Sequence, residues 1–67
     1  MSDLTLSKRE AEVLQHIADG KLCKQVAADL NISERTVQTH IVNIRKRHRI
    51  QGIPAMVAAA IRQGLIK

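Results

Sequence analysis

The connection between two helical patterns in the middle of the chain is the feature that most constrains its fold. Apolar residues recur with one-sided helical spacing at Leu22, Cys23, Val26, Ala27 and Leu30. Three residues, Asn31, Ile32 and Ser33, separate this stripe from the next helical pattern. Asparagine tolerates a left-handed backbone and serine is a strong helix N-cap, so the connection has the composition of a tight turn. The pattern predicts two helices joined by that turn.

Two further helices are predicted, one on each side of this pair. Ser7 and Glu10 stand three residues apart before an apolar run, as in a capping box, and Gly20 follows that run. Pro54 suits the first position of a last helix. The predicted helices span 8–19, 22–30, 34–47 and 54–63. Because no stretch alternates with the two-residue period of a strand, we expect an all-α fold, a compact four-helix domain over residues 1–67.

The size and composition of the chain bound its function. With 67 residues, it forms one small domain of marginal stability. A ligand pocket of roughly 300 Å³ is hard to enclose in so small a core, so we expect no enzyme, no catalytic residue, no cofactor and no small-molecule ligand. One cysteine excludes an intramolecular disulfide and a cysteine-based zinc site. No apolar run reaches the ~20 residues of a membrane span, and the first ten residues lack the charged and then apolar pattern of a signal peptide. We therefore expect no membrane partner and a cytoplasmic location.

Positive charge is concentrated in the middle of the chain. The formal net charge is +5, and residues 33–49 hold five of the 11 lysines and arginines but one of the 6 acidic residues. Such a stretch is either a solvated helix face, with cations favoured near a helix C-terminus, or an electrostatic footprint for a polyanion. Charge by itself does not separate the two interpretations.

The predicted helix 34–47 has two different faces. At about 100° per residue, its core stripe consists of Val37, His40, Ile41 and Ile44. The opposite face carries Arg35, Gln38, Thr39, Val42, Lys46 and Arg49, with Asn43 at its edge. These are the kinds of side chain that meet phosphates, base edges and thymine methyls, although a polar surface with one exposed valine is the plainer interpretation. Because this helix follows a tight turn, we favour a helix-turn-helix that presents it to the DNA major groove.

The spacing of many residues resembles that of a known family. The residues concerned are Leu6-Ser7-x-Arg9-Glu10-x-Glu12-Val13-Leu14, then Ile17-Ala18-x-Gly20, then Lys24-x-Val26-Ala27-x-x-Leu30-x-Ile32-Ser33-x-x-Thr36-Val37-x-x-His40-x-x-x-Ile44, and finally Ala58-x-Ala60-Ile61-Arg62-x-Gly64-Leu65-Ile66. From Leu6 to Ile66 the chain resembles the LuxR-type helix-turn-helix DNA-binding domain, the family of LuxR, FixJ, NarL and GerE.

The resemblance implies a function and a set of site residues. It implies sequence-specific binding of double-stranded DNA by a bacterial-type transcription regulator, with the third helix in the major groove. Base reading falls to Gln38, Thr39 and Val42, which the helical face also presents outward. The expected phosphate contacts are Lys24 and Thr36, from the resemblance, with Arg35, Asn43 and Lys46 from the outward face.

The chain departs from the family pattern at three places. Members continue after the third helix with a Lys-Leu-Gly turn, whereas this chain has Arg47-His48-Arg49, which indicates a longer or more basic helix end. Gly52-Ile53-Pro54 stands where the fourth helix of members opens with an Asn-Arg or Ser-Arg cap. Gln38 and Val42 stand where members often carry a cationic base reader, so no preferred DNA sequence is carried over.

The predicted fourth helix is apolar nearly all round. One face must pack on the domain, and the other is either a tolerated exposure of small side chains or a surface for self-association. Family members dimerise through this helix, so we expect a weak homodimer through Val57, Ala58 and Ile61, in which each monomer reads one half-site. RNA polymerase is a further expected partner, and association with the nucleoid follows from DNA binding.

A different class of function stays open beside DNA binding. A basic helical module that binds an acidic protein partner would carry the same charge. Single-stranded nucleic acid is a weaker alternative, because the chain has no aromatic side chain on which bases could stack. We expect no metal site, because His16, His40 and His48 lack the three- or four-residue helical spacing of paired ligands.

Overall fold

The computed structural model describes residues 4–67, so the first three residues of the predicted domain lie outside the described part. Its four helices are α1 (Lys8–Ala18), α2 (Cys23–Leu30), α3 (Glu34–His48) and α4 (Ile53–Arg62), and residues 4–67 contain no strand. The all-α, four-helix prediction is confirmed. None of these helices is long and apolar enough to cross a membrane.

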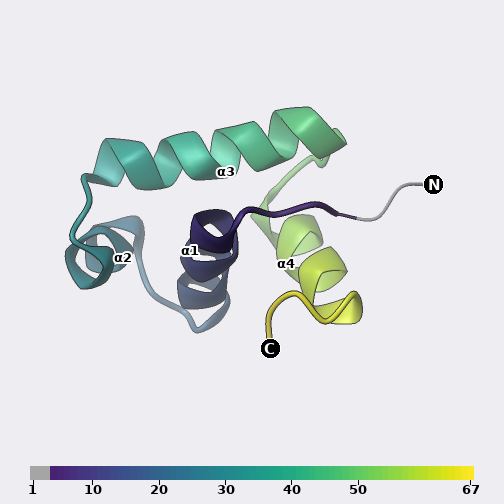
Figure 1. Ribbon diagram of the computed structural model, residues 1–67, viewed down its shortest axis with the longest axis horizontal. Helices are drawn as coiled ribbons and strands as arrows, with labels where there is room; N and C mark the ends of the chain where they lie inside the picture. Colours follow the sequence, from purple (N-terminus) through teal and green to yellow (C-terminus); the bar gives the residue numbers. More distant parts are fainter. Residues whose placement is uncertain (1–3) are drawn as a thin grey trace.

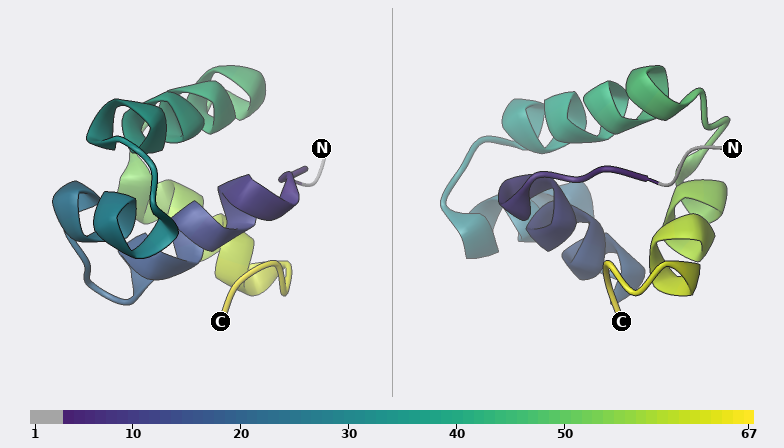
Figure 2. Two further views of the ribbon diagram at one scale, coloured as in Figure 1. Left: turned by 60° about the vertical axis from the view of Figure 1, so that its left-hand side comes forward. Right: turned by 45° about the vertical axis from the view of Figure 1, so that its right-hand side comes forward.

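The longest helix, α3, lies across the other three (Figure 1). It packs against α1 and α2, which also contact each other. Figure 2 shows that α3 keeps to one side of α1, α2 and α4 when the molecule is turned. One long face of α3 is therefore covered by the body of the domain, and the other is open to solvent.

The core that holds this arrangement draws on every helix. Its fully buried side chains are Val13, Leu14, Val26, Val37, Ile44, Met56 and Ala60. Burial of one large apolar side chain stabilises the fold by about 1.5–3 kcal/mol, so this set fixes the angle between α3 and its neighbours. Val37, Ile41 and Ile44 of the predicted α3 stripe are buried, whereas His40 is half-buried at the edge of the core.

The predicted caps are present. Ser7 Oγ accepts the N–H of Glu10 at 3.1 Å and Glu10 Oε1 accepts the N–H of Ser7 at 2.9 Å, which closes the capping box of α1. In the turn between α2 and α3, Asn31 has a left-handed backbone with φ 57°. Ser33 Oγ then accepts the N–H of Thr36 at 3.0 Å, at the start of α3. These bonds satisfy donors that a helix N-terminus leaves free.

The helix ends differ from the predicted ones by one residue, each for a local reason. α2 begins at Cys23 because Leu22 is extended and donates its N–H to Gln25 Oε1. α1 ends at Ala18, with Asp19 as its C-cap.

The ends of the last two helices are also shifted by one residue. α3 continues through His48 because the left-handed turn falls at Arg49, with φ 54°. α4 begins at Ile53 and ends at Arg62, so Pro54 occupies the second helical position and Gly52 precedes the helix in an extended conformation. Proline is tolerated there because the first N–H groups of a helix need no intrahelical partner.

Candidate nucleic-acid interface

The open face of α3 contains a shallow depression built from the first half of the helix. It is lined by Glu34, Arg35, Gln38, Thr39 and Val42. The structure thus brings together the three side chains predicted to read bases. Helical spacing did not include Glu34 among the outward residues predicted from the sequence. Its position four residues before Gln38 nevertheless places it on the same face.

The hydroxyl of Thr39 is engaged with the helix backbone. Thr39 Oγ1 donates to the carbonyl oxygen of Arg35 at 2.9 Å, so the hydroxyl is turned back along α3. The γ-methyl group is then the part of Thr39 left for a contact outside the helix. Gln38 is exposed and Val42 is half-buried beside it. The depression therefore combines an amide and apolar groups with the charged side chains of Glu34 and Arg35.

The predicted phosphate contacts lie on two helices. Lys24 is exposed near the start of α2, and the other four, all on α3, are also exposed: Arg35, Thr36, Asn43 and Lys46. Thr36 Oγ1 lies 2.8 Å from Ser33 Oγ, so these two hydroxyls are hydrogen-bonded at the N-terminus of α3. All five predicted side chains are accessible from solvent.

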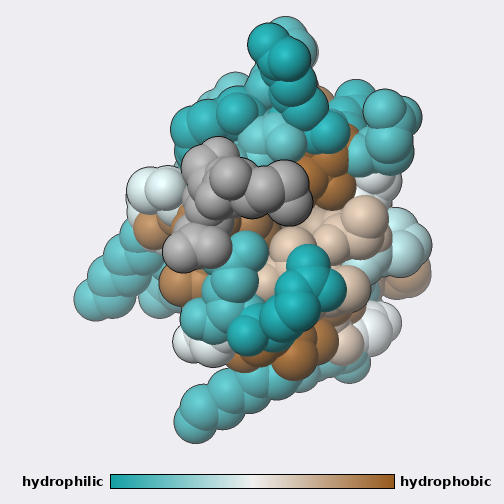
Figure 3. All heavy atoms as spheres, turned by 90° about the vertical axis from the view of Figure 1, so that its right-hand side faces the viewer, coloured by the Kyte–Doolittle hydropathy of each residue, from teal (hydrophilic) through white to brown (hydrophobic). Residues whose placement is uncertain are grey.

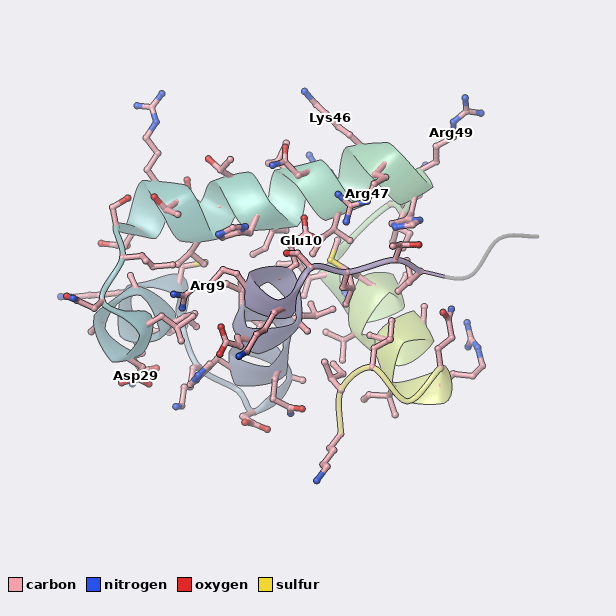
Figure 4. All side chains as sticks on the ribbon, in the orientation of Figure 1. Arg9, Glu10, Asp29, Lys46, Arg47 and Arg49 are labelled. Atoms are coloured by element: carbon pink, nitrogen blue, oxygen red, sulfur yellow. The ribbon has the colours of Figure 1, made fainter. Side chains whose placement is uncertain are left out.

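A second depression lies at the C-terminal end of α3. Its lining residues are Arg45, Lys46, Arg49, Ile50 and Gln51. Figure 4 shows Lys46 and Arg49 extending away from the helical body, on the side of α3 opposite to the other helices. The more basic helix end that the sequence indicated is thus a cationic surface.

Arg47 differs from its cationic neighbours because it faces the domain. Its guanidinium contacts the carboxylate of Glu10, with Nη2 2.6 Å from Oε1 and Nη1 3.2 Å from Oε2 (Figure 4). Nη2 also donates to the carbonyl oxygen of Thr5 at 2.7 Å. The central positive stretch is therefore not one uniform footprint, because this arginine is used to join α3 to the start of α1.

Glu10 is held in its ionised form by this contact. Burial by itself raises the pKa of its carboxyl, but the hydrogen bonds from Arg47 and from the N–H of Ser7, with the charge of Arg47, outweigh burial. The result is a pKa below the ordinary value of 4.5. No sequence signal paired these residues, because they are 37 positions apart.

A second ion pair lies away from α3. Lys21 Nζ is 2.7 Å from Asp29 Oδ2 and 3.0 Å from His16 Nδ1. The hydrogen bond and the charge of Lys21 hold the pKa of Asp29 below its ordinary value. This group joins α1, the following loop and α2. Within residues 4–67, no three His, Cys, Asp or Glu side chains are grouped as a metal site requires.

The predicted self-association residues on α4 have different surroundings. Val57 is half-buried and packs against the core, whereas Ala58 and Ile61 are exposed, Ile61 by 48%. Leu65, just beyond α4, is 39% exposed. Figure 3, which faces this end of the molecule, shows apolar surface gathered below the hydrophilic side chains at the top of the view.

Comparisons with known proteins identify the family. The fold and the open face of α3 define a helix-turn-helix protein, and the family described as bacterial regulatory proteins, luxR family, matches residues 4–60. The chain is 37% identical over 59 residues to the spore germination protein GerE of Bacillus subtilis, covering 88% of this chain and 80% of GerE. It is 42% identical over 64 residues to the response regulatory protein YgeK of Escherichia coli, covering 96% of this chain and 44% of YgeK. The chain belongs to the luxR family.

A solved structure agrees with this placement. The response regulator ChrA of a heme-sensing two-component system matches 98% of this chain with a TM-score of 0.83 and 41% identity. The chain spans 33% of that ChrA chain and less than half of YgeK. The transcriptional regulatory protein FixJ of Rhizobium meliloti is 38% identical over 60 residues, covering 90% of this chain and 29% of FixJ. Family, fold and relatives together support DNA binding by a transcription regulator.

Proposed function

We propose that the chain binds double-stranded DNA sequence-specifically, with α3 in the major groove. The observation that carries this proposal is the composition of the depression on α3, where Gln38, Thr39 and Val42 lie together on the solvent side. A major groove is about 12 Å wide and admits an α-helix. Gln38 can pair with N6 and N7 of adenine, and Val42 and the Thr39 methyl group can contact thymine methyls.

Phosphate contacts supply most of the affinity in this proposal. Lys24 approaches one strand from α2, while α3 contributes Arg35, Thr36, Asn43 and Lys46. Each cation that neutralises a phosphate releases condensed counterions, so binding becomes steeply dependent on salt. The domain acts by binding and not by catalysis, without a cofactor or a small-molecule ligand.

The proposal extends to assembly and location. Two copies pair weakly through the exposed side of α4, at Ala58 and Ile61 with part of Val57, so that each reads one half-site. Close helix approach is compatible with the small side chains of α4. The regulator works in the cytoplasm on nucleoid DNA and contacts RNA polymerase there.

An amide-resolved NMR titration with a short duplex at low salt tests the binding surface. We expect shifts concentrated at Lys24 and over residues 35–46, reversed by added salt because they depend on counterion release. A duplex that shifts only residues of α4, or none, would overturn the proposal and favour a basic module for an acidic protein partner. Titration with an acidic peptide under the same conditions distinguishes that outcome.

A further inference from the structure

Three cations at the C-terminal end of α3 form a surface of their own. Arg45, Lys46 and Arg49, here called the C-terminal cationic cluster, are exposed and line one depression together with Ile50 and Gln51. Among residues 4–67 no carboxylate forms an ion pair with any of the three. Arg47, from the same turn, is paired with Glu10. The cluster therefore presents unneutralised positive charge to solvent, which favours a polyanion.

The backbone at Arg49 supports a role for its side chain. Arg49 adopts φ 54° to end α3, and the N–H of Ile50 donates to the carbonyl oxygen of Arg45 at 3.2 Å across this turn. Glycine is favoured at such a position because a Cβ is strained in the left-handed region. An arginine there carries a conformational cost that capping the helix does not require, so the observed outlier points to a function of the guanidinium.

The length of α3 sets where this cluster meets DNA. With 15 residues, the helix is about 22 Å long, which exceeds the groove width of about 12 Å. The base-reading depression occupies its first half, from Glu34 to Val42. If that half lies in the groove, the last turn emerges over a sugar–phosphate backbone. The cluster then lies about 15–21 Å along α3 from Arg35, which faces the other strand.

We propose that Arg45 and Arg49, with Lys46, form a second phosphate-binding site that clamps the DNA strand at the C-terminal end of α3. This inference rests on the proposed function, because it places a further contact on the same helix. Arg35 and the C-terminal cationic cluster hold the two strands on either side of the groove, and this fixes the depth and register of α3. The clamp acts on the backbone, so it adds affinity for every DNA sequence equally.

Salt dependence of duplex binding tests the clamp. Fluorescence anisotropy with a labelled duplex of about 20 base pairs gives log K against log salt, where each phosphate contact contributes a slope of about −0.9. We expect Arg45→Ala and Arg49→Ala each to reduce the slope by about 0.9 and to weaken binding at 50 mM salt by roughly tenfold. Arg62→Ala, which removes the same charge from α4, is the matched control and should leave the slope unchanged.

A second variant separates binding from folding. Arg49→Gly removes the guanidinium and relieves the left-handed strain, so the melting temperature should stay the same or rise, by up to roughly 4–8 °C. Binding should still weaken as it does in Arg49→Ala, and Arg49→Lys should retain most of the slope.

The clamp is overturned if Arg45→Ala, Arg49→Ala and Arg49→Gly keep the same salt slope and affinity as Arg62→Ala while Arg35→Ala has a reduced slope. In that case the proposed function still stands. Failure of the unmodified chain to bind the duplex would instead remove the proposed function, and the clamp with it.

Discussion

Arg47 and Glu10 form a two-point contact that joins the end of α3 to the beginning of α1. The guanidinium meets both carboxylate oxygens, at 2.6 and 3.2 Å, and the same carboxylate accepts the N–H of Ser7. The Glu10 side chain is 8% exposed, whereas that of Arg47 is 42% exposed. A buried carboxylate is tolerated when it is paired with a cation and hydrogen-bonded. Removal of the cation leaves an uncompensated buried charge, which is strongly destabilising. The contact therefore holds α3 in place while leaving its opposite face open.

Replacement of Arg47 should destabilise the fold. Arg47→Ala leaves the Glu10 carboxylate buried without its cation, and we expect a loss of about 2 kcal/mol in the free energy of unfolding. Chemical denaturation measures this loss. Arg45→Ala is the control, because Arg45 is exposed on the same turn of α3 and should change stability by less than about 0.5 kcal/mol. Equal stability of the two variants would contradict a structural role for the contact.

The stabilising effect of this contact should depend on pH. Glu10 has a lowered pKa in the folded chain, so its contribution is complete above the ordinary value of 4.5 and is lost as the pH falls through the lower folded-state pKa. The difference in unfolding free energy between the unmodified chain and Arg47→Ala should therefore be constant from pH 7 to about 5 and shrink in more acidic solution. Denaturation series at several pH values measure it. A difference that stays constant down to pH 2 would show that ionised Glu10 is not its source.

The fold was predictable because its signals are local. Ser7 and Glu10, and likewise Ser33 and Thr36, lie three residues apart, and a cap is decided within such a distance. Apolar periodicity located the buried faces for the same reason. The end of α3 at His48 was not predicted, because the left-handed turn falls on Arg49, a residue type that rarely adopts it.

The candidate site was predictable in part. Helical spacing of about 100° per residue is enough to gather Gln38, Thr39 and Val42 on one face, as the structure has them. The same spacing placed Lys46 and Arg49 on the outward face, but it could not identify the partner of Arg47. Arg47 differs from Arg45 and Lys46 because it is paired with Glu10, a residue 37 positions away that only the tertiary packing brings close.

The γ-methyl group of Thr39 should read a thymine methyl. Thr39→Ser keeps the hydroxyl that donates to the carbonyl of Arg35 but removes the methyl, whereas Thr39→Val does the reverse. On a duplex selected by the unmodified chain, replacing thymines one at a time by uracil should cost about 1 kcal/mol at the contacted position. Thr39→Ser should lose this sensitivity and Thr39→Val should keep it. If Thr39→Ser senses every uracil as the unmodified chain does, the assigned contact is wrong.

The carboxylate of Glu34 should oppose DNA binding. Glu34 lines the same depression as Arg35 and Gln38, so it lies where phosphates and base acceptors approach. Glu34→Gln removes a repulsion and should strengthen binding several-fold, at a loss of about 0.5 kcal/mol in stability because the carboxylate favours the helix N-terminus. Fluorescence anisotropy measures the change in DNA binding, and chemical denaturation measures the change in stability. Glu12→Gln on α1 is the control of equal charge change. Weaker binding by Glu34→Gln would indicate instead that Glu34 accepts a hydrogen bond from cytosine.

The exposed apolar side of α4 should govern self-association. Ile61 is 48% exposed beside Ala58, so Ile61→Gln removes apolar contact area from the proposed dimer without opening the core. Sedimentation equilibrium should show a shift towards monomer, and binding to a duplex with two half-sites should lose cooperativity, while binding to one half-site is unchanged because α3 is untouched. Leu22→Gln makes the same kind of change at a residue 69% exposed before α2 and should leave both properties intact. A mass distribution unaffected by Ile61→Gln would exclude this side of α4 as the contact.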